Sequence, residues 1–326
     1  MDEPTVLELT DAGYGRSPSR LERVLYAPAA CDWIVAGYFF TVVVGLTRAR
    51  AGTARDLYLL FSMAILTGYI ACVYLYRFRF EAARRVGYGA RLAYHLLPLF
   101  AVLTLYLNLR AILPLLNGAL HDESLYQLDL HIFGFEPTLL IERVTTSSVV
   151  EWFAFFYYSY FFLIGSFIFV MIMTVEDDER LSHFSAGMLT VVCVGHFIYA
   201  LVPGFGPYEF LAHDYGRPLV GGTFYNLVLD AVAGAGPLRD IFPSLHTALP
   251  TFCALFAWRH YPRVAPVVTF FAGNIMAATI VLRWHYAVDV IAGLLLAVAA
   301  FLLVPRMVES YQARRAEVGL ASLRRW

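Results

Sequence analysis

The sequence is dominated by apolar runs that are long enough to cross a lipid bilayer. A helix needs about 20 mostly apolar residues to span the hydrocarbon core. Because 60% of the 326 residues are hydrophobic and only 15% are charged, the chain is too apolar for a soluble globular domain of this length. We therefore expect an all-α fold, a polytopic transmembrane helix bundle of about eight spans. The predicted spans are residues 30–47, 57–76, 93–116, 149–174, 183–203, 245–261, 264–282 and 286–305. The first is interrupted by Asp32 and the sixth is short, so six spans are the alternative.

The spans and the loops between them divide the chain into five segments. Two connections are long, and such connections in compact membrane proteins are usually functional or partly structured. The first mixes apolar and polar residues, as an amphipathic element on a membrane surface does, and the second is rich in glycine and proline. The segments are a polar N-terminal segment 1–29, transmembrane helices in 30–116, an outer amphipathic loop 117–148, a transmembrane core 149–305 that includes the outer loop 204–244, and a basic tail 306–326.

The arginines set the expected orientation, because positively charged loops stay in the cytoplasm. All 24 basic residues are arginine. With eight spans, 16 of them fall on the side of the two termini and the other eight on the opposite side. We therefore expect an integral membrane protein whose termini are cytoplasmic and whose long loops lie outside. The absence of lysine is typical of GC-rich bacterial genomes, so the expected location is a bacterial inner (cell) membrane.

Two short motifs carry the chemistry that the sequence predicts. The first runs from Phe242 to His246, where the second long loop enters the sixth span, and the second runs from Arg283 to Asp289, where the seventh span turns into the eighth. Two membrane crossings separate the motifs, so His246 and His285 return to the same membrane face. His285 and Asp289 are four residues apart at the start of a helix, which places both side chains on one helical face.

These three residues suit phosphoryl transfer through a covalent intermediate. Asp289 would hold one ring nitrogen of His285 and leave the other free to attack phosphorus, which gives a phosphohistidine. His246 would protonate the leaving oxygen and then activate the acceptor. No cofactor is expected. The four cysteines share no close spacing, and lysine is absent, so neither a cysteine metal site nor Schiff-base catalysis is expected.

Phosphoryl transfer also needs positive charge around the phosphate oxygens. Four of the arginines on the outer side are candidates for this role, and Ser244 lies at a helix N-terminus that can bind an anion. Arg110 has the alternative role of an interfacial anchor, and Arg217 and Arg239 that of solvated loop charges. His95, His183 and His196 are interpreted as packing residues. The candidate phosphate ligands are Arg283, Ser244, Arg239, Arg217 and Arg110.

The two motifs resemble signatures of the type 2 phosphatidic acid phosphatase (PAP2) superfamily of metal-independent lipid phosphatases and phosphotransferases. Phe-Pro-Ser-Leu-His at 242–246 is similar to its second motif, and the sequence at 283–293 to the end of its third. Within the superfamily the chain resembles the inositol phosphorylceramide synthase branch and its bacterial relatives, a likeness that extends to residues 128–138, to 201–203 and to Pro207. The resemblance covers about residues 95–300, and it implies that His285 is the nucleophile, Asp289 its partner and His246 the acid–base group.

The sequence departs from the phosphatase pattern in two places. The basic residue expected before Arg217-Pro218 is replaced by Phe210, and the Ser-Arg pair expected before His285 is replaced by Ala278-Thr279. Both departures suit the transferase-like branch, and both leave the phosphate ligands undefined.

The expected function is therefore a lipid phosphotransferase of the inositol phosphorylceramide synthase type, with a lipid phosphoester donor and a lipid alcohol acceptor. A lipid phosphate phosphatase that uses water is the alternative, because the two activities share one phosphoenzyme. A transporter is a more distant alternative, since it would call for internal repeats, and none is visible. Nucleic acid is not an expected partner, and the sequence leaves the oligomeric state open.

Overall fold

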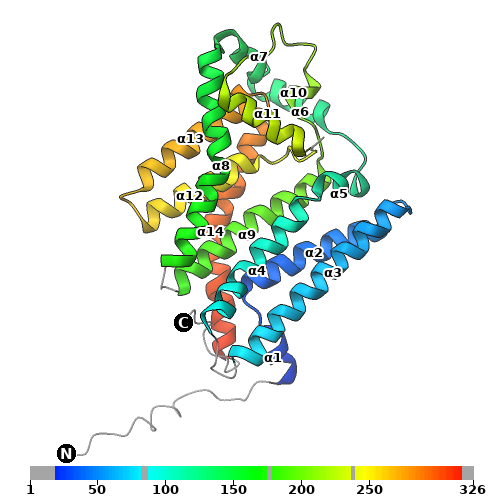
Figure 1. Ribbon diagram of the computed structural model, residues 1–326, viewed down its shortest axis with the longest axis vertical. Coiled ribbons are helices and arrows are strands. Elements are labelled where there is room, and N and C mark those ends of the chain that lie inside the picture. The colour runs from blue at the N-terminus through cyan, green and yellow to red at the C-terminus, as the bar shows by residue number, and fades with distance from the viewer. Residues whose placement is uncertain (1–18, 82–86, 175–177, 236–238, 318–326) are drawn as a thin grey trace, which may run out of the picture.

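The computed structural model describes residues 19–81, 87–174, 178–235 and 239–317, and throughout these ranges the chain is built from helices without a strand. The predicted all-α fold class is thereby confirmed. Figure 1 shows an elongated molecule in which the first helix and the C-terminal end of the last helix lie at the same end of the bundle. The short helix α1 (Arg20–Tyr26) begins there with a capping box between Ser19 and Glu22.

The N-terminal helices pack as hairpins beside the core, and the last of them is broken. They are α2 (Ala30–Arg48), α3 (Thr53–Leu75), the π-helical turn Tyr76–Glu81, α4 (Tyr88–Tyr106) and α5 (Leu109–Leu116). The axes of α4 and α5 meet at 65°. Asp32, which interrupts the first predicted span, is buried and accepts hydrogen bonds from the hydroxyls of Tyr69 and Tyr94. A carboxylate is tolerated in this apolar run because its oxygens are paired.

Five further helices form the core of the molecule. They are α8 (Ser147–Thr174), α9 (Asp178–Leu201), α12 (Leu245–His260), α13 (Ala265–Val281) and α14 (Ala287–Glu317). Helix α12 lies between α13, α14 and α9, and most of its residues are buried. Glycines permit its close approach: a Cβ at Gly195 of α9 would clash with Leu245, and one at Gly293 of α14 with the backbone oxygen of Ser244.

Both predicted outer loops fold at the end of the bundle opposite to the chain ends (Figure 1). The first contains α6 (Asp122–Phe133), α7 (Pro137–Ile141) and the 3-10 turn Glu142–Val144. The second contains α10 (Pro207–Phe210) and α11 (Thr223–Ala235). The backbone joins the two loops, because the amide of His121 donates to the carbonyl of Pro203 over 2.9 Å. These elements form a cap over the start of α12 and α14.

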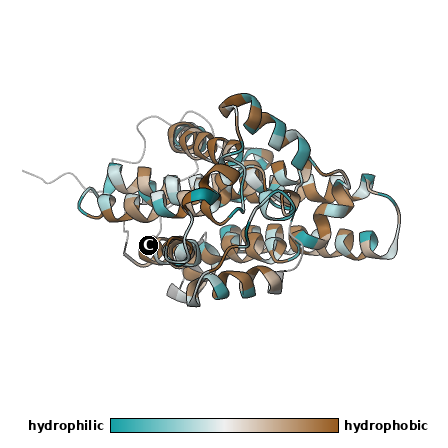
Figure 2. Cartoon of the chain, turned by 90° about the horizontal axis from the view of Figure 1, so that it is seen from above, coloured by the Kyte–Doolittle hydropathy of each residue, from teal (hydrophilic) through white to brown (hydrophobic). Residues whose placement is uncertain are grey.

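Long apolar helices characterise the chain as a membrane protein. Among the described residues, α2, α3, α8, α9 and α14 are long and apolar enough to cross a bilayer, and the bent pair α4–α5 would make a sixth span. Large apolar side chains are exposed on α8 and α14, and Figure 2 shows apolar turns over much of the helical surface. Helices α12 and α13, at 16 and 17 residues, are shorter than a typical span. The count of eight, which includes this short hairpin, stays a prediction. The predicted tail is in part a continuation of α14, which runs to Glu317.

Candidate active site

The two histidines of the sequence motifs meet at the capped end of the bundle. The ring centroids of His246, on the first turn of α12, and His285, just before α14, are 6.0 Å apart. His285 Nδ1 lies 3.3 Å from Asp289 Oδ2, and both side chains are buried. The predicted catalytic trio is thus contiguous in space.

His285 follows a tight turn that ends α13. The amide of Arg283 donates to the carbonyl of Ile280, and that of Trp284 donates to the carbonyl of Thr279, which is the Schellman arrangement. Glycine is usual at the left-handed position of this motif, yet here it is Arg283, with φ 65°. The amide of His285 also donates to Thr279, over 3.1 Å. This turn fixes the backbone from which the imidazole projects.

Asp289 has two tasks at the start of α14. One oxygen accepts a hydrogen bond from the backbone amide of Tyr286 over 2.9 Å, as the third residue of a capping box does. The same oxygen lies beside His285 Nδ1. The backbone amide of Tyr286 therefore orients the carboxylate of Asp289, and this carboxylate in turn orients the imidazole of His285. Burial, aided by the neighbouring His246, lowers the pKa of His285. The ring is consequently neutral at neutral pH, as a nucleophile must be.

Asp129 of α6 caps the same helix from outside. Its carboxylate accepts from the amides of Ala287 and Val288 over 2.7 and 2.8 Å, and the side chain is fully buried. Burial raises the pKa of Asp129, and the two amides oppose that rise. Together with Asp289, this residue satisfies three amides at the N-terminus of α14, where the helix dipole favours negative charge.

Asp122, at the start of α6, holds the loop that follows α9. Its carboxylate accepts from the amides of Phe205 and Gly206, over 3.0 and 2.7 Å, and is 3.4 Å from the hydroxyl of Tyr286. Gly206 has φ 93°, and a Cβ there would meet the carbonyl oxygen of Trp284. Helix α6 therefore positions both the loop and the start of α14.

Aromatic rings enclose His246. Tyr157 of α8 stacks on its ring at 4.5 Å, and Tyr160 lies against it at 4.3 Å. Trp284 extends the aromatic wall, 6.2 Å from Tyr157 and 4.7 Å from Tyr208. Aromatic faces attract a cationic imidazolium, so these contacts are compatible with the acid–base role predicted for His246.

Two of the candidate phosphate ligands meet at Glu142 instead of at the histidines. Arg283 Nη2 forms an ion pair with Glu142 at 3.1 Å, and its guanidinium lies 3.6 Å above the ring of Tyr215. The amide of Arg217 donates to Glu142 over 3.0 Å, and its side chain donates to the carbonyls of Glu142 and Thr145. Burial raises the pKa of Glu142, but the amides of Arg217 and Gly216 and the charge of Arg283 more than offset this and lower it.

The other three candidates have different surroundings. Ser244 is buried and caps α12, where its hydroxyl accepts from the amide of Thr247 over 3.3 Å. Arg110 donates to the carbonyl of Gly234 at the end of α11. Arg239 lies 5.4 Å from the centre of the Phe205 ring, and within the described ranges its guanidinium has no ion pair or hydrogen bond. Their role in phosphate binding stays a prediction.

Sequence reasoning missed four residues that build this site. Asp122, Asp129 and Glu142 hold backbone amides from distant segments, and Tyr157 stacks on His246. Asp129 lies in an amphipathic stretch in which an acid alternates with leucines. An acid in such a stretch is the sequence signal that would have identified Asp129.

The comparisons with known proteins identify the family. No curated protein and no solved structure matches the chain significantly. The PAP2 superfamily, in contrast, matches residues 123–303, which is more than half of the chain and extends from α6 into α14. This stretch includes His246, His285, Asp289 and the capping residue Asp129. The chain belongs to the PAP2 superfamily, whose members are phosphatases and phosphotransferases.

Proposed function

We propose that the chain is a membrane-embedded, metal-independent phosphotransferase of the inositol phosphorylceramide synthase type. It transfers a phosphoalcohol head group from a donor phospholipid to the hydroxyl of a second lipid through a phosphohistidine intermediate. Its superfamily supports phosphoester chemistry. The resemblance of residues 128–138 to the synthase branch supports the transferase, because Asp129 of this stretch caps the helix that carries the catalytic pair.

The observation that carries the proposal is the contiguity of His246, His285 and Asp289. Asp289 lies beside Nδ1 of His285, and the ring also has a hydrogen bond with the backbone of Ile241. The proposal assigns the attack on phosphorus to Nε2, the nitrogen that Asp289 does not contact. The second histidine is 6.0 Å away, which leaves room for a phosphoryl group between the rings. A single histidine with an acid would suit a structural role, whereas two buried histidines and a carboxylate suit nucleophile, orienter and acid–base catalyst.

The reaction has two balanced steps. In the first, Nε2 of His285 attacks the phosphorus of the donor, an N–P bond forms, the P–O bond to the diacylglycerol breaks, and protonated His246 donates its proton to the leaving oxygen. In the second, His246 takes the proton of the acceptor hydroxyl, the acceptor oxygen attacks phosphorus, and the N–P bond breaks. Asp289 holds the His285 ring in one tautomer during both steps.

The N-terminus of α12 and Arg239 are the groups best suited to bind the phosphate. The backbone amide of His246 lies in the first turn of α12, just after the N-cap residue Ser244. Among the described residues it has no hydrogen-bond acceptor, so it is available to an anion. Arg239 has a guanidinium that is available to an anion, whereas Arg217 and Arg283 are engaged by Glu142. Arg110 would assist from the mouth of the site, beside α11.

The proposed site faces the outside of a bacterial inner membrane, with both termini in the cytoplasm. The cap lies at the end of the bundle opposite to α1 and the C-terminal end of α14, which is compatible with this orientation (Figure 1). It is tested by labelling single cysteines at Val220 in the cap and at Arg314 near the end of α14, with the exposed Cys72 replaced by serine. An impermeant maleimide added to intact cells should label position 220 alone. Labelling of position 314 alone would reverse the orientation.

The acceptor is tested with purified protein in detergent and phosphatidylinositol that carries a labelled head group. We expect labelled inositol phosphorylceramide when ceramide is present, and little head-group release when it is absent. His285→Ala is the control for background turnover. Equal head-group release with and without ceramide, with no labelled ceramide product, would favour the water-dependent phosphatase.

A further inference from the structure

A second cluster of ligating side chains lies at the end of the bundle opposite to the histidines. Glu179 and His183 of α9 and Glu309 of α14 each offer one ligand atom, and these three atoms lie within 4.8 Å of one another. Glu179 and His183 are four residues apart, so they share one helical face. We propose that these three residues, the distal cluster, form a binding site for a divalent transition-metal ion of the zinc type.

His183 is the residue that points to a ligand. Its side chain is buried, with 7% of its surface exposed, and among the described residues its Nε2 atom has no hydrogen-bond partner. The nearest carboxylate oxygen, Oε1 of Glu309, is 3.7 Å from this nitrogen, which is beyond hydrogen-bond length. A buried ring nitrogen normally finds a partner. The partner it lacks is supplied by an ion placed between the imidazole and the carboxylates.

The distances suit a metal better than a direct bond. Zinc binds imidazole nitrogen at about 2.0–2.1 Å and carboxylate oxygen at about 2.0–2.2 Å. Two ligands at those lengths in a tetrahedron are roughly 3.4 Å apart, so the 3.7 Å pair needs little movement. Glu309 is more than half exposed and can move toward the ion. One nitrogen and two carboxylates favour zinc or manganese over calcium, which prefers oxygen alone.

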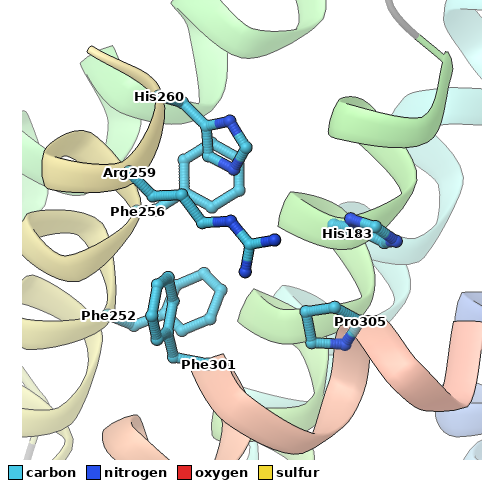
Figure 3. Close-up of a pocket in the computed structure, with 7 residues that line it drawn as sticks. All are labelled: His183, Phe252, Phe256, Arg259, His260, Phe301 and Pro305. Atoms are coloured by element: carbon cyan, nitrogen blue, oxygen red, sulfur yellow. The ribbon is translucent and has the colours of Figure 1, made fainter.

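The adjoining pocket leaves space for water to complete the coordination. It has room for about one water molecule, and His183 forms part of its wall. Figure 3 shows His183 and Pro305 of α14 on one side of this pocket and His260 of α12 on the other, with the side chain of Arg259 extending from α12 into the pocket toward His183. The three proposed ligands all belong to α9 and α14, whereas Arg259 belongs to α12.

The distal cluster is separate from the proposed chemistry. Glu309 follows Asp289 by 20 residues on one helix, and at 1.5 Å per residue the two are about 30 Å apart. The ion would join α9 to α14, the helices whose other ends lead into the loop held by Asp122 and into the catalytic pair. Its expected effect is stabilisation of this helix pair, and turnover needs no contribution from it.

The test is zinc binding to the full chain in detergent, after removal of any affinity tag and treatment with a chelator. Isothermal titration with zinc chloride should give one ion per chain and a higher melting temperature. Glu179→Gln and Glu309→Gln, both at accessible positions, should each weaken binding at least about tenfold, and the double variant should lose both binding and the thermal shift. His260→Gln, on the opposite wall of the pocket, is the matched control and should bind as the parent does.

Two results would overturn the proposal. One is the absence of a stoichiometric zinc site in the parent protein at micromolar concentration. The other is unchanged binding in the Glu179→Gln, Glu309→Gln double variant when its helical content matches that of the parent. X-ray absorption of the zinc-loaded protein should show one imidazole and oxygen neighbours. Lipid turnover of the double variant reports separately on the proposed phosphotransferase, so the two proposals can fail independently.

Discussion

The two ends of α14 use acidic residues in opposite ways. At its start, the carboxylates of Asp122, Asp129 and Asp289 are buried, and each accepts hydrogen bonds from backbone amides. Near its other end, Glu309 is exposed, and its nearest basic neighbour is a histidine 3.7 Å away. The first set holds backbone amides, whereas Glu309 belongs to the proposed metal site.

This difference shows where the phosphate can bind. A helix N-terminus is an anion site, but at α14 the protein's own acids already occupy the amides of Tyr286, Ala287 and Val288. A phosphate is therefore left with the first turn of α12, where the amide of His246 lacks an acceptor. In the proposed mechanism, α14 positions the nucleophile and α12 receives the anion.

The largest effect is expected at the catalytic pair. His285→Ala should abolish head-group transfer, because no other side chain can accept the phosphorus. Asp289→Asn should keep the fold but lower kcat by about 10⁴, as loss of an orienting carboxylate does in a Ser-His-Asp triad. Steady-state assays with labelled phosphatidylinositol and ceramide measure both. Full activity of His285→Ala would contradict the role of His285 as the nucleophile.

Asp129→Asn should have the next largest effect. Its carboxylate accepts two amide hydrogen bonds, and an amide side chain can replace only part of this pairing. Loss of one hydrogen bond to a buried charge costs about 1.5–3 kcal/mol. We expect kcat to fall by roughly 10- to 100-fold and the melting temperature to drop. Glu123→Gln, on the exposed side of the same helix, is the control and should change neither.

A smaller effect on kcat/KM is expected at the arginines, and it should differ between Arg239 and Arg217. Arg239→Gln should lower kcat/KM about tenfold through loss of a charge-assisted phosphate contact. Arg217→Gln should lower it less, because Arg217 is bonded to Glu142 and to the carbonyl of Thr145. The comparison uses kcat/KM for the same donor lipid. A greater loss in Arg217→Gln than in Arg239→Gln would assign the clamp to the Glu142 cluster.

The smallest effect is a pH dependence of stability at Glu136. Burial, with a contribution from Asp129, raises the pKa of Glu136 to about 7, and hydrogen bonds from Thr138 oppose the rise. A carboxyl that is more basic in the folded state stabilises the fold below its ordinary pKa of 4.5, and this contribution is lost as pH rises through 7. Melting temperatures measured from pH 4.5 to 8 should fall less steeply for Glu136→Gln than for the parent. Identical slopes would contradict the shift.

The catalytic trio was predictable because it depends on two local rules. A count of two membrane crossings returned His246 and His285 to one end, and the four-residue spacing paired His285 with Asp289. The structure brings them together through a hairpin of two short helices, α12 and α13, and the count of eight spans remains a prediction. Convergence of the motifs required only that the chain turn back once.

Other parts of the site depend on contacts that no local pattern shows. Asp129 accepts hydrogen bonds from the amides of Ala287 and Val288, which follow it by 158 and 159 positions in the sequence. Its role therefore requires the packing of α6 on α14. Arg283 resembled a phosphate ligand because it precedes His285, but it occupies the left-handed turn position where glycine is usual, and its side chain pairs with Glu142. His183 was interpreted as a packing residue because its neighbour Glu309 lies on a distant helix.

The most direct test of the account is to trap the covalent intermediate. The purified protein is mixed with phosphatidylinositol labelled at phosphorus, without ceramide, and quenched in alkali, because phosphohistidine is stable to base and labile to acid. Peptide mass spectrometry should find phosphoinositol on His285 alone, no adduct in His285→Ala, and transfer of the label to lipid when ceramide is added before the quench. An adduct on another residue, or ceramide product formed by His285→Ala, would contradict the account.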